Sequence, residues 1–122
     1  MSASTRLTRP AAALRKFALA YPEATEAMPW GHHAFKVKGK SFLFMSVNDG
    51  EFSMSAKLPS SGGVVLSLPY ASPTEYGLGK SGWVTARFAR GKAIPLDDLK
   101  LWVDESYRAI APKKLTGLLK AK

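Results

Sequence analysis

The sequence predicts a single α+β domain, a two-layer sandwich in which an antiparallel sheet of four or five strands carries three helices on one face. Apolar residues recur every three or four positions near both ends of the chain, which is typical of amphipathic helices. Between these segments, apolar and polar residues alternate, which is typical of strands. A chain of 122 residues suits one core. We therefore expect one domain over 1–122, with its core at about 8–115 and a basic tail at 113–122.

The first helix is expected from about Thr8 to Ala20. Thr8 is a suitable N-cap, Pro10 fits the first turn, and Pro22 ends the helix. One apolar stripe runs along it, formed by Leu7, Ala11, Leu14, Ala18 and Tyr21. The following residues, with two acids and Pro29, predict a linker.

Three strands are expected next, joined by tight turns into a meander. From His33 to Lys38, apolar residues alternate with lysines, and a Gly39-Lys40 turn follows. The segment Ser41 to Val47 is almost wholly apolar, which predicts a central strand covered on both faces. After a turn at Asn48-Asp49-Gly50, the segment Glu51 to Lys57 alternates again, with Ser53, Ser55 and Lys57 on its polar face.

The second half predicts a short helix after Pro59 and a turn-rich segment over 69–79 with room for one short strand. A strand from Gly82 to Ala89 is expected to place Trp83, Thr85 and Arg87 on one face. The last long helix is expected from Leu96 to Ile110, with acids in its first turn and Arg108 in its last. One more helical turn is expected in the basic tail.

The charge favours a polyanionic partner. Eighteen Lys and Arg against nine Asp and Glu give a net charge of +9. The best candidate surface is the helix-free face of the sheet together with basic segments beside it, and DNA is the partner it predicts. The expected nucleic-acid-binding residues are Lys36, Lys38, Lys57, Lys80, Trp83, Arg87, Lys113 and Lys114. The alternative is a solvated face that keeps the domain soluble, with Trp83 tucked under a loop.

No catalytic, metal or cofactor site is predicted. The chain has no cysteine, and the segment Gly77-Leu78-Gly79-Lys80-Ser81 fails as a phosphate-binding loop because Thr74 replaces the first glycine. His32 and His33 should point to opposite faces of a strand, although Glu23 or Glu26 could pair with one of them. No G-x-S-x-G nucleophile motif occurs. A chain without a signal peptide or a long apolar run is expected to be cytoplasmic and not bound to a membrane.

Four segments carry a resemblance to a known family. They are Tyr21-Pro22-Glu23, the hairpin from His33 to Phe42, the strand Lys80-Ser81-Gly82-Trp83-Val84, and Ser106-Tyr107-Arg108 in the last long helix. Their order and spacing resemble the MmcQ/YjbR family of small bacterial proteins, over about residues 8–115. The resemblance implies a fold similar to that of the frataxin-like CyaY proteins and of secretion chaperones. It also implies DNA binding, the description commonly given to the family, and supplies no catalytic motif.

Two hypotheses for function remain, and neither is an enzyme. The first is a DNA-binding domain of low sequence specificity. The second is a protein-interaction module that binds a peptide, or another copy of itself, through the open sheet or an edge strand. An enzyme using His32 or His33 with Glu23 is the weakest alternative, and a deep pocket lined by these residues would revive it.

Overall fold

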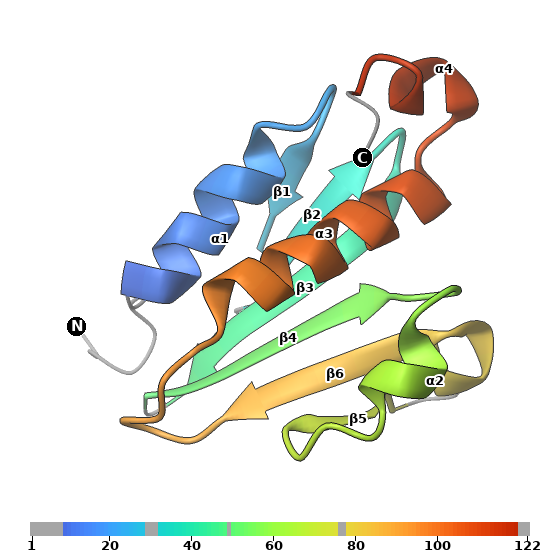
Figure 1. Cartoon of the computed structure of the whole chain (residues 1–122). Helices are drawn as coiled ribbons and strands as arrows, with labels where there is room; N and C mark the ends of the chain where they lie inside the picture. The colour runs from blue at the N-terminus through green and yellow to red at the C-terminus, as the bar shows by residue number, and fades with distance from the viewer. Residues whose placement is uncertain (1–8, 29–31, 49, 76–77, 120–122) are drawn as a thin grey trace.

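A computed structural model describes residues 9–28, 32–48, 50–75 and 78–119 of the chain (Figure 1). The expected cap Thr8, the residues Pro29, Asp49 and Gly77, and the tail residues 120–122 lie outside these ranges. The elements in chain order are α1 (Arg9–Leu19), β1 (Thr25–Ala27), β2 (His33–Val37), β3 (Lys40–Asn48), β4 (Glu51–Lys57), α2 (Gly62–Val65), β5 (Ala71–Pro73), the 3-10 helix η3 (Leu78–Ser81), β6 (Trp83–Phe88), α3 (Leu96–Ile110) and α4 (Lys113–Thr116).

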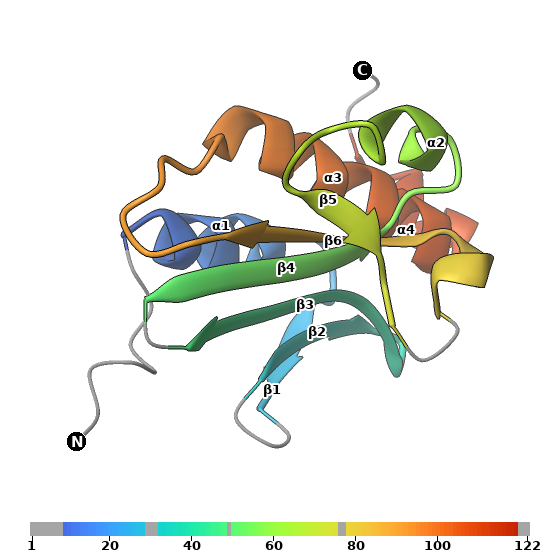
Figure 2. The same ribbon diagram turned by 90° about the horizontal axis from the view of Figure 1, so that it is seen from below.

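The predicted two-layer α+β architecture is confirmed. The strands form one antiparallel sheet of order β1-β2-β3-β4-β6-β5. Seen edge-on, α1 and α3 lie over one face of this sheet, with α2 and α4 on the same side, and the opposite face carries no helix (Figure 2). We call this helix-free side the open face.

The sheet has six strands and not the expected four or five, because the segment taken as a linker contains β1. Thr25 pairs with Lys36 and Ala27 with Ala34, so β1 continues the sheet beyond β2. A strand of only three residues is too short to show an alternating pattern in the sequence. Its pairing satisfies backbone groups that β2 would otherwise leave open at the edge of the sheet.

The hairpin between β2 and β3 differs in detail from the expectation. Lys38 and Gly39 both have positive φ, 51° and 80°, and Val37 pairs with Lys40. Two left-handed residues in a two-residue loop define a type I′ turn, whose twist matches that of the flanking strands. Lys38 therefore lies at the turn and not on the polar face of β2.

A β-bulge follows this hairpin. Lys36 pairs with Ser41 while Phe35 pairs with Leu43, so Phe42 is an extra residue in β3. Phe42 and Leu43 are consequently both buried in the core. Beyond the bulge, Phe44 and Ser46 lie on the open face and are half-buried. The expectation that this strand is covered on both faces was therefore wrong.

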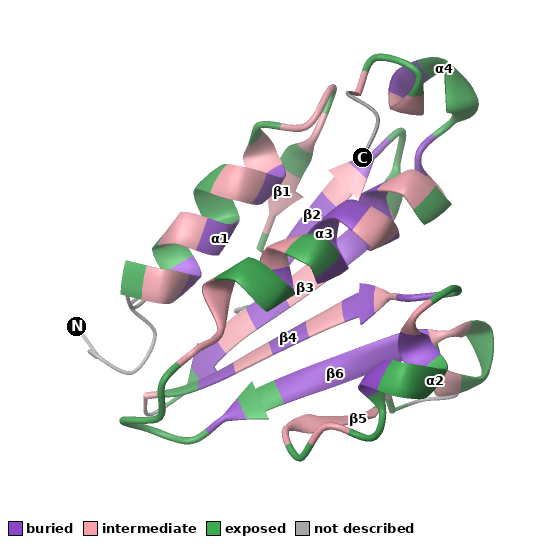
Figure 3. Ribbon diagram, viewed as in Figure 1, coloured by how far each residue is buried: buried purple, intermediate pink, exposed green. Residues whose placement is uncertain are grey.

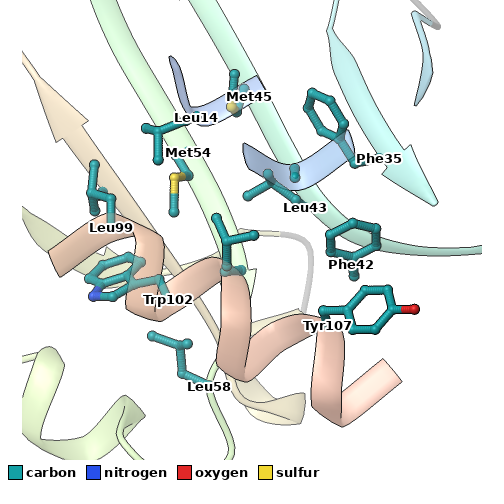
Figure 4. Packing of buried hydrophobic residues seen from close by; sticks show 14 of the residues in the cluster. Leu14, Phe35, Phe42, Leu43, Met45, Met54, Leu58, Leu99, Trp102 and Tyr107 are labelled. Atoms are coloured by element: carbon teal, nitrogen blue, oxygen red, sulfur yellow. The ribbon is translucent and has the colours of Figure 1, made fainter. Parts of the chain in front are cut away.

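The core lies between the sheet and the helices α1 and α3. Buried residues follow the inner faces of these elements, as the burial colours along the ribbon show (Figure 3). Leu14 of α1, Leu99 and Trp102 of α3, and Met45 and Met54 of the sheet meet in this layer (Figure 4). Burial of such side chains is the main stabilising contribution to a domain of this size.

Polar contacts fix the C-terminal half of α3 on the sheet. The Ser106 hydroxyl donates to the carbonyl oxygen of Phe42 at 2.5 Å and accepts from the backbone N–H of Lys57 at 2.8 Å. The Tyr107 hydroxyl donates to the carbonyl oxygen of Pro22 at 2.7 Å, and Tyr21 donates to Asp104 at 2.6 Å. Burial and this bond to Asp104 raise the pKa of the Tyr21 hydroxyl.

Candidate functional site

Two lysines share one cross-strand row on the open face. The bulge pairs Lys36 of β2 with Ser41 of β3, and Lys57 at the end of β4 pairs with Trp83 at the start of β6. Because neighbouring strands lie about 4.8 Å apart, the strands that carry the two lysines are about 10 Å apart. The row therefore presents two positive charges on the same side and at the same end of the sheet.

Other lysines gather at this end of the molecule. The β2–β3 turn with Lys38, the 3-10 helix η3 with Lys80, and α4 lie toward the same end of the sheet, with α4 near the β2–β3 turn and η3 on the β6 side (Figures 1 and 2). A backbone hydrogen bond from Leu58 to the carbonyl oxygen of Gly82, at 2.8 Å, joins the end of β4 to the residues after η3. We call this region the lysine end, formed by Lys36, Lys38, Lys57, Lys80, Lys113 and Lys114.

The carboxylate of Glu23 neutralises part of the positive charge of the lysine end. The Lys38 ammonium lies 2.8 Å from Glu23 Oε1. The hydrogen bond from Lys38 and its charge hold the pKa of the Glu23 carboxyl below its ordinary value, and the charge of Lys114 adds to this effect. The other five lysines make no ion pair with a residue that the structure describes. The region therefore keeps a strong positive excess.

Two of the expected site residues do not belong to this cluster. Trp83 is only 7% exposed and packs against Phe44, with ring centroids 5.4 Å apart. Trp83, expected among the nucleic-acid-binding residues, therefore offers little surface to a nucleic acid. Arg87 pairs with Ser53 and lies four residues further along β6. At about 3.3 Å per residue it is about 13 Å from the row of Lys57 and Trp83.

Arg87 instead lines a cavity on the open face that sequence reasoning did not foresee. The cavity has a volume of about 330 Å³. Its floor carries hydroxyls of β3, β4 and β6, and Thr74, Glu75 and Leu78 form one wall. The lining residues are His32, Phe44, Met45, Ser46, Ser53, Ser55, Thr74, Glu75, Leu78, Thr85 and Arg87. The only signal in the sequence was the run of Ser and Thr at alternate strand positions.

The two histidines have different environments, as expected for adjacent residues of a strand. His32 is exposed and lines the open-face cavity. His33 is buried, and its Nδ1 lies 2.5 Å from Glu26, which also binds Arg15 at 2.6 Å. Burial acts to raise the pKa of Glu26, but the hydrogen bonds and charges of Arg15 and His33 outweigh it and hold that pKa below its ordinary value.

The contact between Glu26 and His33 ties β1 to β2 and, through Arg15, to α1. No group of three or more His, Asp or Glu side chains suited to a metal ion occurs within the described ranges. None of the helices that the structure describes is long and apolar enough to cross a membrane.

Comparison with protein-family models shows the family to which the chain belongs. The YjbR family model matches residues 19–109, which include the whole sheet and all of α3 except its last residue. The protein is a member of the YjbR family. The resemblance drawn from the hairpin and the late helix is thereby confirmed.

Solved structures support the fold. A Deinococcus radiodurans protein of the domain family DUF419 is 23% identical, with a TM-score of 0.68 over 93% of this chain and 87% of the other. A Pseudomonas syringae protein is 14% identical, with a TM-score of 0.61 over 84% of this chain and 98% of the other. At these identities the likeness concerns the fold alone. No curated protein matches the sequence.

Proposed function

We propose that this domain binds DNA without catalysing a reaction, and that the lysine end makes the contact. The observation that carries the proposal is the position of its six lysines. They come from β2, the β2–β3 turn, β4, η3 and α4, and these segments lie toward one end of the sheet, with α4 near the β2–β3 turn and η3 beside β6 (Figures 1 and 2). Lysines clustered in this way, of which Lys38 alone is paired with a described carboxylate, suit the phosphate oxygens of a nucleic acid backbone.

Binding should depend little on base sequence. Lysine–phosphate contacts set the position of a protein on DNA but carry no sequence information. Base reading in the major groove usually requires a long helix or a two-stranded ribbon that enters it. The elements of the lysine end are turns, strand ends and the four-residue helix α4. Since Trp83 is buried, stacking on unpaired bases does not contribute, and duplex DNA should bind at least as well as a single strand.

The test is the salt dependence of binding to a labelled duplex of arbitrary sequence, followed by fluorescence anisotropy. The double variant Lys36→Gln/Lys57→Gln removes the two charges of the cross-strand row. We expect weaker binding and a logarithmic salt slope that is smaller by about 2, because each phosphate contact contributes about 0.9. Both lysines are half-buried and make no described ion pair, so the fold should persist.

The matched control is Arg90→Gln/Lys92→Gln, which removes two exposed charges in the turn after β6, at the far end of that strand from Trp83. The control should keep the wild-type slope. Absence of binding at low salt contradicts the proposed function. Equal losses in the two double variants contradict the proposed surface, because the effect would then follow net charge alone.

The alternative function is a protein-interaction module, and the same binding experiments bear on it. Binding of a partner along an edge strand is disfavoured, because the edge strands β1 and β5 are three residues each and β5 ends in Pro73. A partner retained after nuclease treatment and at high salt, by a protein that fails to bind DNA, would favour that reading over ours.

A further inference from the structure

The open-face cavity is separate from the lysine end and has a chemistry of its own. Its floor consists of outward-facing positions of β3, β4 and β6, where Ser46 faces Ser53 and Ser55 faces Thr85. Thr74 and Leu78 form the wall that rises from the β5–η3 segment. The volume of about 330 Å³ is at the small end of the range for ligand pockets.

The hydroxyls of the cavity floor have more O–H donors than their mutual hydrogen bonds use. The Thr85 hydroxyl lies 2.7 Å from that of Ser55 and 2.9 Å from that of Thr74. Three hydroxyls joined by two hydrogen bonds use two of their three hydrogens, so one O–H remains to donate. Ser46 and Ser53 are joined by a single bond of 2.8 Å, which leaves a second O–H. Within the described residues these two donors have no further acceptor, and the cavity lies in front of them.

The positively charged side chain of Arg87 lies at the edge of this floor. The Arg87 side chain is 49% exposed, and its nearest described carboxylate, Glu75, is 4.0 Å away and 71% exposed. So long and exposed an ion pair contributes little and can open. The guanidinium therefore keeps donors for a ligand, and a planar fork of N–H groups fits a carboxylate with two parallel hydrogen bonds. His32 adds an exposed ring on the cavity lining.

The remaining lining is apolar. Phe44 is half-buried and packs against Trp83, which fixes its ring beside the hydroxyl floor. Leu78, 37% exposed, lines the cavity from the wall. A ligand that fits must accept hydrogen bonds and carry negative charge at one side, and offer a flat apolar body to the other.

We propose that this cavity binds a small planar carboxylate, an aromatic acid in chemical class. The carboxylate pairs with Arg87 and accepts the spare hydroxyl hydrogens, while the ring lies against Phe44 and Leu78. This site does not depend on DNA binding, because none of its lining residues belongs to the lysine end. The two proposals therefore stand or fall separately.

Benzoate is the probe, titrated to millimolar concentration into the isotope-labelled protein while backbone amide NMR signals are recorded. We expect saturable shifts centred on Ser46, Ser53 and Thr85. Benzamide has the same shape without the charge and should bind about tenfold more weakly, since hydrogen bonds between charged partners are about twice as strong as neutral ones. Arg87→Gln should weaken benzoate binding to a similar degree. The matched control Arg90→Gln changes an exposed arginine in the turn after β6 that does not line the cavity, and it should leave benzoate binding unchanged.

Three results would overturn the proposal. They are an unchanged spectrum on adding benzoate, benzamide binding as tight as that of benzoate, and benzoate shifts that centre on the lysine end as a general anion effect. The Arg87→Gln spectrum without ligand shows whether the fold is retained. Retention is expected, because Arg87 is exposed and its only described ion pair is the one with Glu75.

Discussion

Ser106 bridges two backbone groups that the sheet cannot pair with each other. Because the bulge adds Phe42 to β3, the ladder between β3 and β4 begins only at Leu43 and Ala56. The fully buried Ser106 hydroxyl fills this gap by bonding the carbonyl oxygen of Phe42 and the N–H of Lys57. Ser106→Ala therefore removes a partner from two backbone groups at once.

The expected cost follows from these two contacts. Leaving a buried backbone donor or acceptor without a partner costs about 1–3 kcal/mol, and the small apolar alanine itself fits the site. Two such groups predict a loss of about 3 kcal/mol in the free energy of unfolding. A domain of this size has about 5–15 kcal/mol in total, so the loss would be plain in a denaturation curve.

Urea denaturation followed by tryptophan fluorescence measures this loss, with an unchanged dependence on urea concentration as the sign that the unfolding reaction is the same. The matched control is Ser53→Ala; among the described residues, the Ser53 hydroxyl bonds only that of Ser46 on the open face. It should cost less than about 1 kcal/mol. A Ser106→Ala loss no larger than that of Ser53→Ala would refute the bridging role.

Two further variants test the contacts that join α1 and β1 to the rest of the domain. Tyr21→Phe removes the 2.6 Å hydrogen bond to the buried Asp104, and urea denaturation should show a loss of about 2 kcal/mol; no loss would contradict a stabilising role. Glu26→Gln should change the pH dependence of stability. The folded-state pKa of Glu26 lies below its ordinary value of 4.5, so its contribution is present above that pH and is lost as the pH falls through the folded-state pKa. The variant should show a shallower loss of stability in acid, and an unchanged acid profile would contradict the assignment.

The fold was predictable where patterns were long. The last helix lies over Leu96–Ile110 as expected, and the alternation of Glu51–Lys57 correctly separated its inner and outer faces. The three-residue strand β1 was not predicted, because its formation depends on pairing with the edge of β2 and not on a pattern in its own residues. The bulge at Phe42 was not predicted either, because a continuous apolar run gives no sign in the sequence that one extra residue points inward.

The candidate site shows the same limit more sharply. Alternation correctly assigned Lys36, Lys57, Trp83 and Arg87 to the open face. It did not show that Trp83 is buried beside Phe44, or that Arg87 lies at a different end from the lysines. Burial and position along a strand depend on the strand register and on the segment between β5 and η3, which are tertiary features.

The central claim, DNA binding at the lysine end, is tested most directly by mapping a short duplex onto the protein by NMR. The account predicts that the largest amide shifts fall in residues 36–41, 56–58, 78–82 and 112–117, and that they fade as salt is raised. Shifts centred on the opposite end, at residues 50–52 and 87–96, or no shifts at low salt, would contradict it.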